Sequence, residues 1–296
     1  MNALDSNSQT PTTQNAPRSD FIWTPTAKKI HTACDLARES RTVVFVWGPS
    51  HIGKTWAVEQ YCGARQRPEV RRRTPDLCPL TSDFRPPTYA RLHAACGLTG
   101  VVRVVAAALG LSATSRAATI ARIKDALAPD TLLILDECHL LAHTARPGSF
   151  HNCMEVIREL HDHAKCGLVL IFTLLDRVRA ASQKELQQLW RRGVHKVQLA
   201  AMPTKGDVAA ILEHHGLNFP ERALTIPIRA GRETLEERPY EILRQLARDE
   251  ALLAITERIR YARKLAARAN ERLEWPHFVD AHLRIAKNAE QEGDWE

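Results

Sequence analysis

The residues with the clearest chemistry lie in one eight-residue segment, where glycine, lysine and threonine have the spacing of a phosphate-binding loop. Residues 48–55 match the pattern G-x-x-x-x-G-K-[ST] in full. The two glycines let the backbone curl, so that successive N–H groups point at phosphate oxygens. Lysine then supplies charge to the β- and γ-phosphates, and the threonine hydroxyl is suited to ligate Mg²⁺. The predicted ATP-binding residues are Gly48, Pro49, Ser50, His51, Ile52, Gly53, Lys54 and Thr55.

Two acids follow an apolar run, residues 131–135, about 80 residues beyond this loop. Asp136 is placed to hold Mg²⁺ through water. Glu137 is placed to orient and deprotonate an attacking water, which requires a carboxylate near the γ-phosphate. The pair therefore predicts ATP hydrolysis, and the glutamate favours an additional-strand ATPase over a GTPase or a kinase.

Three further residues are candidates for the same reaction. Thr173 ends another apolar run, where its side chain can hydrogen-bond the γ-phosphate or the lytic water. Arg191 and Arg192 precede the last strand expected in this part of the chain. One of these arginines is predicted to reach a neighbouring subunit's nucleotide and stabilise the transition state there. The alternative is that they are solvated cations at a helix end, where the helix dipole favours them.

The elements that position these residues are short apolar strands alternating with helices. Strands are expected at 42–47, 68–75, 131–135, 168–173 and 195–199, and helices start near 24 and cover 56–61, 88–96, 101–109, 115–128, 150–164 and 182–192. This alternation predicts an α/β fold, a P-loop core whose mainly parallel sheet is flanked by helices. We expect a flexible tail at 1–20, a nucleotide-binding core at 21–203 and a small all-helical lid at 204–296.

Composition excludes several classes of protein. The 296 residues are 44% hydrophobic and 25% charged, which is ordinary for a globular protein and excludes collagen and a wholly disordered chain. No apolar run is long enough for a membrane helix, and residues 1–20 lack the apolar segment of a secretory signal. Seven cysteines without a CxxC pattern indicate a reducing compartment, so we expect a cytoplasmic protein.

The charge is basic overall and unevenly distributed. Lys and Arg number 41 against 34 Asp and Glu, a net charge of +7. Residues 204–296 hold 15 basic and 17 acidic residues, a net of −2, so residues 1–203 carry +9. A basic excess favours an anionic partner without identifying it, and we expect that partner to face the first two thirds of the chain.

Histidines and cysteines are concentrated between 138 and 166, which raises the alternative of a zinc site. Their spacing lacks a paired ligand pattern, and several fall on an expected helix. Cys138 and Cys166 are better interpreted as small buried hydrophobic residues.

Taken together, four segments resemble the AAA+ ATPases of DNA transposition, the family of the phage Mu B and TnsC/TniB-like proteins. They read FIWT at 21–24, GPSHIGKT at 48–55, ILDECHLL at 134–141 and EVIRELHDHAKCGLVLIFT at 155–173. The resemblance implies an AAA+ core with a helical lid, and ATP-dependent rings or filaments on double-stranded DNA. It also implies a transposase as partner. Thr173 then corresponds to the first sensor and Arg191 or Arg192 to the arginine finger.

The sequence departs from this family in its lid. We also expect no counterpart of the extra N-terminal DNA-binding domain of the Mu protein, because residues 1–20 cannot form one. Leu253 stands where a lid arginine is expected, so either Arg258 or Arg260 replaces it or the lid senses nucleotide weakly. DNA contacts are then expected from basic residues of the core, mostly to phosphates and weakly sequence-specific. The candidates are Arg71, Arg72, Arg73, Arg85 and Arg91.

Two other functions fit the same motifs. A helicase-loader or initiator-like ATPase shares the nucleotide site and differs in its partner. A nucleotide-gated signalling or binding module would show little turnover, and Glu137 argues against it. A P-loop kinase or transferase is disfavoured because no acceptor-binding acid is apparent.

Overall fold

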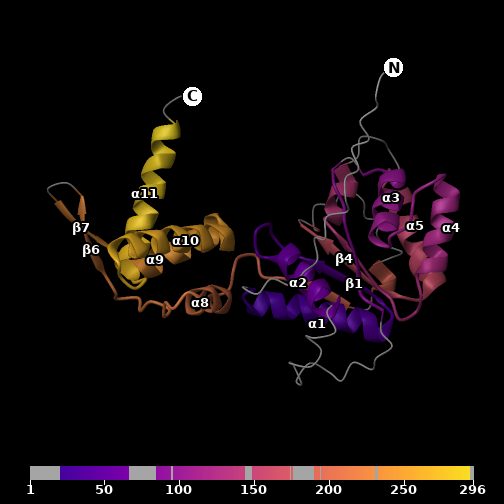
Figure 1. Ribbon diagram of the computed structural model, residues 1–296, viewed down its shortest axis with the longest axis horizontal. Helices are drawn as coiled ribbons and strands as arrows, with labels where there is room; N and C mark the ends of the chain where they lie inside the picture. Colours follow the sequence, from indigo (N-terminus) through magenta and orange to yellow (C-terminus); the bar gives the residue numbers. More distant parts are fainter. Residues whose placement is uncertain are drawn as a thin grey trace, which may run out of the picture.

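A five-stranded parallel sheet organises the first two thirds of the protein (Figure 1). The computed structural model describes residues 21–66, 85–94, 96–143, 149–173, 175, 190–193, 195–230 and 233–293. The strand order is β2-β3-β4-β1-β5, and all four pairings are parallel. The strands are β1 (Val43–Trp47), β2 (Thr88–Arg91), β3 (Leu132–Asp136), β4 (Gly167–Phe172) and β5 (His195–Gln198).

Helices cover both faces of this sheet, so the central strands are buried on both sides. The first pair is α1 (Pro25–Ser40) and α2 (Lys54–Gln66). Their apolar residues pack with alternate strand residues such as Val44 and Ile134. On the other face α3 (Leu98–Ala108), α4 (Arg116–Ala126) and α5 (Ser149–Ala164) pack against intervening residues such as Phe45 and Leu135. Apolar residues at every strand position are what such double burial requires, and the predicted α/β fold is confirmed.

The start of α1 follows directly from its sequence. The side chain of Thr24 accepts a hydrogen bond from the backbone N–H of Ala27 at 3.1 Å, and Pro25 occupies the first helical position. A threonine cap favours helix initiation because it accepts a hydrogen bond from an N–H that has no partner within the helix. A proline at the first position favours it because the N–H that proline lacks would have no partner there. The predicted helix start near Thr24 is therefore confirmed.

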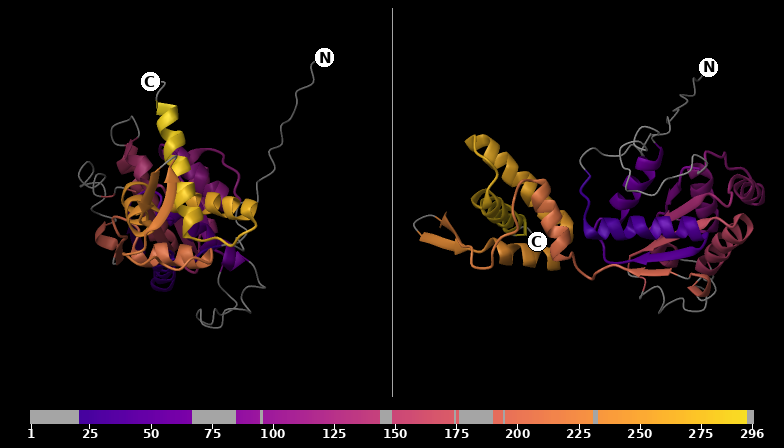
Figure 2. Two further views of the ribbon diagram at one scale, coloured as in Figure 1. Left: turned by 90° about the vertical axis from the view of Figure 1, so that its left-hand side faces the viewer. Right: turned by 90° about the horizontal axis from the view of Figure 1, so that it is seen from below.

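The last third of the chain forms a C-terminal lobe beside the sheet (Figure 1; Figure 2, right). Its helices are α8 (Lys205–His214), α9 (Pro239–Asp249), α10 (Ala251–Ala269) and α11 (Trp275–Gly293). They enclose an apolar cluster of their own, which includes Leu212, Leu246 and Phe278. The expectation of an all-helical segment needs correction, because an antiparallel hairpin of β6 (Ile226–Ala230) and β7 (Glu233–Glu237) interrupts the helices.

One carboxylate joins this lobe to the sheet region. Asp207, in the first turn of α8, accepts hydrogen bonds from the backbone N–H and the hydroxyl of Thr26 in α1, at 2.8 and 2.9 Å. It also accepts from the backbone N–H of Thr204 at 3.0 Å and from its hydroxyl at 2.6 Å. Because Asp207 is fully buried, it fixes the start of α8 to the start of α1.

One expected helix is replaced by a strand, and several expected segments lie outside the described residues. Residues 88–96 were expected to be helical, whereas 88–91 form strand β2 and the helix begins only at Leu98. The strand expected at 68–75, with its three arginines, lies outside the described residues, as do residues 1–20 and most of the helix expected at 182–192. Among the helices that the structure describes, none combines the length and apolar character needed to cross a bilayer.

Candidate active site

The phosphate-binding loop joins the end of β1 to the start of α2. The backbone N–H of Gly48 donates to the carbonyl of Phe172 on β4 at 3.3 Å, which ties the loop to the carboxyl edge of the sheet. A Cβ at position 48 would lie 2.8 Å from the Cβ of Leu199, so only glycine fits there. Gly53 has a φ of 90° immediately before α2, a conformation that side chains disfavour. The local structure therefore favours glycine at both of these positions of the motif.

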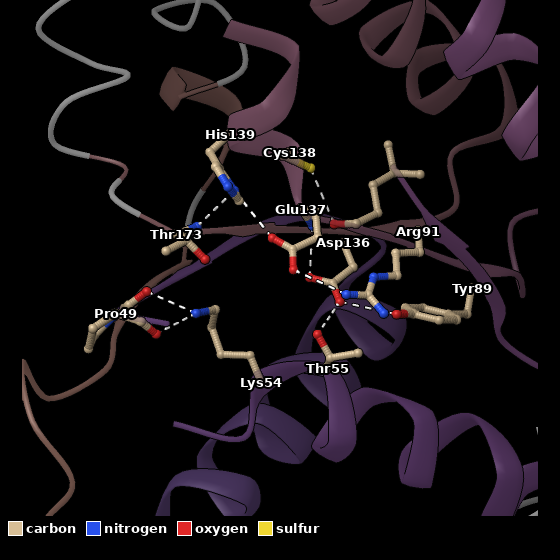
Figure 3. Close-up of polar contacts among 12 residues, drawn as sticks. Pro49, Lys54, Thr55, Tyr89, Arg91, Asp136, Glu137, Cys138, His139 and Thr173 are labelled. Atoms are coloured by element: carbon tan, nitrogen blue, oxygen red, sulfur yellow. Dashed lines mark hydrogen bonds and ion pairs between the residues drawn. The ribbon is translucent and has the colours of Figure 1, made fainter. Parts of the chain in front are cut away.

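Lys54 is buried at the start of α2, with its amine inside the loop. Its Nζ donates to the carbonyl oxygens of Gly48 at 2.9 Å and Pro49 at 2.6 Å (Figure 3). Burial lowers the pKa of Lys54, while the carboxylates of Asp136 and Glu137 oppose part of that shift. The amine thus lies within the electrostatic field of both acids.

Asp136 is the centre of a buried hydrogen-bond group at the end of β3. Its Oδ2 accepts from the hydroxyls of Thr55 at 2.8 Å and Tyr89 at 3.1 Å, and its Oδ1 accepts from the backbone N–H of Glu137 at 2.8 Å. Burial, followed by the charge of Asp136, raises the pKa of Tyr89, which keeps this hydroxyl a donor. Tyr89 comes from strand β2, and no motif in the sequence pointed to it.

Glu137 directly follows Asp136, and its backbone lies in the left-handed region, with a φ of 61°. Its Oε1 lies 3.7 Å from Nη2 of Arg91, and its Oε2 lies 3.4 Å from Nδ1 of His139 (Figure 3). Burial and then the neighbouring Asp136 raise the pKa of Glu137, while Arg91 and Lys54 act in the opposite direction. A carboxylate with a raised pKa is better suited to accept a proton from water.

Thr173 lies just beyond β4, at the same edge of the sheet as the two acids. Its backbone N–H donates to Nδ1 of His139 at 3.4 Å. The structure therefore brings the predicted loop, acids and Thr173 together, as Figure 3 shows, and adds Tyr89, Arg91 and His139 to them. The carboxyl ends of parallel strands meet at one edge, and this is where open α/β sheets bind ligands.

The two candidate arginines differ in their surroundings. Arg192 forms an ion pair with Asp162 of α5 in its own chain. Arg191 is exposed and forms no ion pair with another residue that the structure describes. Both follow Trp190, whose ring packs 5.8 Å from that of Trp47, the residue before the loop.

The predicted DNA-contacting arginines are only partly described. Arg71, Arg72 and Arg73 lie outside the described residues. Arg85 precedes β2 and lies 4.0 Å from Asp130, whereas Arg91 ends β2 beside Glu137. These two arginines therefore lie toward opposite ends of one strand.

The two candidates for a lid arginine, Arg258 and Arg260, also differ in their surroundings. Arg258 is buried within the C-terminal lobe, where it pairs with both carboxylate oxygens of Glu250 at 3.1 Å. Arg260 is exposed. Arg258 is thus committed to a local ion pair, which leaves Arg260 as the remaining candidate of the two.

Cys138 and Cys166 are fully buried, as expected. The Cys138 thiol donates to the carbonyl of Leu135 at 3.2 Å, and burial raises the pKa of both thiols. They are therefore packed core residues with little thiolate character. No cluster of three potential metal ligands of the His, Cys, Asp or Glu type occurs among the described residues.

Comparison with known proteins agrees with this geometry. A family profile described as an AAA domain matches residues 37–181, which contain the P-loop and both acids. The solved structures of the Aeropyrum pernix ORC2 protein share the fold. Its ADPNP–ADP complexes are 13% identical, with a TM-score of 0.56 over 89% of this chain and 70% of theirs. Its ADP form is 14% identical, with a TM-score of 0.54 over 84% and 67%. The protein is an ATPase that carries an AAA domain over residues 37–181.

A more particular likeness comes from sequence. The Mu-like prophage FluMu DNA transposition protein B of Haemophilus influenzae is 24% identical over 213 residues. The match covers 70% of this chain and 65% of that relative, so it spans somewhat less than two thirds of the relative's length. The protein is thus an AAA-domain ATPase related to a transposition protein B, as the sequence motifs predicted.

Proposed function

We propose that this ATPase binds double-stranded DNA without sequence specificity, assembles into oligomers with ATP, and thereby selects target DNA and recruits or activates a transposase. The observation that carries the proposal is the similarity to a DNA transposition protein B over 213 residues. The net charge of +9 on residues 1–203 supports an anionic partner for the sheet region. The likeness to ORC2 concerns the fold alone, so it adds nothing on the partner.

In the proposed reaction, the loop and Lys54 hold the ATP phosphates and Glu137 accepts a proton from the attacking water. The Thr55 hydroxyl and the Asp136 carboxylate are 2.8 Å apart and supply the oxygen ligands that Mg²⁺ prefers. They would hold the ion, which when bound neutralises charge on the β- and γ-phosphates. Thr173 would contact the γ-phosphate or the lytic water.

The arginine in trans is assigned to Arg191. Arg192 is already paired with Asp162 within its own chain, and breaking that pair would oppose its insertion into a neighbour. Arg191 is exposed next to Trp190, on a segment that packs on the strand before the loop. An arginine in this role stabilises charge that develops on the transferred phosphoryl group.

We also propose that the boundary between the ATPase core and the lid lies near Pro203. The apolar cluster of the C-terminal lobe draws its buried members from residues 208–281, and among the described residues of the N-terminal side only Ile22 packs against it. The two clusters of the sheet region draw their buried members from residues 27–199.

Steady-state ATP hydrolysis with and without linear double-stranded DNA tests the enzymatic part. We expect DNA to stimulate turnover in the full chain, and Glu137→Gln to lower it about 10²-fold or more while nucleotide binding persists. Unchanged turnover in Glu137→Gln would remove the proposed role of that residue. Absence of any DNA effect would remove the DNA-dependent part of the proposal.

Electron microscopy with DNA and a non-hydrolysable ATP analogue tests the assembly. We expect oligomers on DNA only when the analogue is present, and their loss when salt is raised, because phosphate contacts release counterions. A monomer that ignores DNA would contradict the proposal. Co-purification with a helicase in place of a transposase would favour the helicase-loader alternative.

A further inference from the structure

His139 lies between Glu137 and Thr173, and one of its ring nitrogens faces both residues. It lies in the short 3-10 helix η2 (Cys138–His143), with its side chain 16% exposed. Its Nδ1 lies 3.4 Å from Oε2 of Glu137 and 3.4 Å from the backbone nitrogen of Thr173. Figure 3 shows the ring between the glutamate and the end of β4.

The chemistry of imidazole makes these two contacts exclude each other. The N–H of Thr173 is a donor, so it needs the lone pair of Nδ1. The Glu137 carboxylate is an acceptor, so it needs a proton on the same nitrogen. One nitrogen cannot satisfy both at once. Both distances exceed the range of well-formed hydrogen bonds to nitrogen donors, as expected for a nitrogen shared between two partners.

We propose that His139 is a positioning residue that makes the orientation of Glu137 depend on the end of β4. When Nδ1 accepts a hydrogen bond from the Thr173 N–H, its lone pair repels the Glu137 carboxylate. That carboxylate then interacts with Arg91 and with water. When Thr173 moves away, Nδ1 carries the ring proton and donates to Glu137, which is held away from its task. The proposal rests on the functions proposed above for Glu137 and Thr173.

Three other charged groups act on Glu137 and limit how far it can turn. Arg91 of β2 lies 3.7 Å from its other oxygen, and Lys54 attracts it from α2. Asp136 repels it from the preceding position. A released Glu137 is therefore drawn toward Arg91 at the end of β2 and toward Lys54 at the start of α2. Contact of Thr173 with a γ-phosphate would decide when this release occurs.

Three variants separate this role from simple packing. In His139→Asn the amide places one polar atom where Nδ1 stands, so one of the two contacts survives. In His139→Gln the amide reaches the position of Nε2 instead, so neither Nδ1 contact survives. His139→Phe keeps an aromatic ring but has no polar atom. His163→Phe, at an exposed position of α5, is the matched control.

Steady-state kinetics of ATP hydrolysis in the full chain give the first readout. We expect His139→Phe and His139→Gln to lower kcat about 10-fold to 100-fold, since a small displacement of a catalytic group costs this much. KM should change less than about twofold, and His139→Asn should recover most of kcat. Turnover of His163→Phe should equal that of the wild type. Equal loss in the Asn and Gln variants, or normal turnover in all three, would overturn the proposal.

A double variant gives the second readout, measured as single-turnover hydrolysis with enzyme in excess over ATP. If His139 acts through Glu137, His139→Phe should cost nothing further in a Glu137→Gln background. Losses that multiply would overturn the proposal, because they indicate independent or structural effects. Normal hydrolysis in Glu137→Gln alone would instead refute the proposed role of Glu137, so the two failures are distinguishable.

Discussion

Replacing Asp207 by alanine removes the carboxylate that fastens the C-terminal lobe to α1. The side chain accepts two hydrogen bonds from Thr26 and two from Thr204, and it is fully buried. Alanine leaves the N–H and hydroxyl of Thr26 without their acceptor and removes the acidic half of the capping box of α8. We therefore expect Asp207→Ala to destabilise the protein and to loosen the attachment of the lobe.

The expected loss in the free energy of unfolding follows from the four hydrogen bonds of Asp207. Hydrogen bonds to a charged group contribute about 1.5–3 kcal/mol each, so four of them sum to about 6–12 kcal/mol before the cost of burying the charge is counted. Burial of the charge opposes this gain, because removing a carboxylate from water costs several kcal/mol. We expect a net loss of about 3 kcal/mol. Asp207→Asn, which keeps an acceptor oxygen and the side-chain size, should lose about half as much.

Urea unfolding followed by circular dichroism measures this loss. With a slope of about 3 kcal/mol per molar urea for a chain of this size, 3 kcal/mol shifts the midpoint by about 1 M. Asp249→Ala is the matched control, because Asp249 is half exposed and pairs only with its neighbour Arg248. Its midpoint should stay within about 0.2 M of the wild type, as expected for an exposed ion pair.

The pH dependence gives an independent check. Burial alone would raise the pKa of Asp207, but the hydrogen bonds from Thr204 and Thr26 outweigh it and lower the pKa below 3.8. A lowered pKa stabilises the fold above the unfolded-state value and loses that effect as the pH falls through the folded-state value. The difference between wild type and Asp207→Ala should be complete at pH 7 and shrink below about pH 4. A midpoint shift under 0.3 M at pH 7, or one independent of pH, would refute this reasoning.

Three further predictions concern the nucleotide site. Gly48→Ala forces a Cβ to within 2.8 Å of Leu199, so we expect a loss of about 1–3 kcal/mol in unfolding free energy together with loss of ATP binding in a fluorescent-nucleotide titration. Normal ATP binding would contradict this expectation, because it would show that the loop accommodates the added methyl group. Tyr89→Phe removes one hydrogen bond to Asp136, the acid proposed to bind magnesium. Isothermal titration should show about fivefold weaker binding of ATP with magnesium, or about 1 kcal/mol, whereas an unchanged affinity would contradict the role of this hydroxyl. Arg191→Ala should lower DNA-stimulated turnover about 10³-fold with ATP binding intact, and Arg192→Ala less than tenfold; the reverse order would reassign the arginine in trans.

The sequence predicted the parts of the fold that depend on local pattern. Continuous apolar runs at β1, β3 and β4 can only be strands buried on both faces, so their positions were recovered within one or two residues. Strand β2 was missed because it has four residues at the sheet edge, alternating buried Thr88 and Ala90 with more exposed neighbours. Its pairing with β3 is a tertiary effect that overrides local preference.

The C-terminal hairpin and the joint at Asp207 were missed for a related reason. Strands β6 and β7 carry charged residues and no apolar run, so their pairing is visible only in three dimensions. Asp207 was part of an expected helix, but its partner Thr26 is 181 residues away in the chain. The phosphate loop and the acids were recognisable because their chemistry fixes residue type and spacing, whereas Tyr89, Arg91 and His139 reach the site through strand pairing and a short turn.

The left-handed backbone of Glu137 has a consequence for the evolution of this site. A residue other than glycine held at a φ of 61° costs about 1–2 kcal/mol. Glycine at this position would relieve the strain, so Glu137→Gly should raise the melting temperature while removing the carboxylate proposed to activate water. Selection for stability and selection for turnover thus oppose each other at this single position, and a glutamate that persists here among relatives would record the demand for hydrolysis.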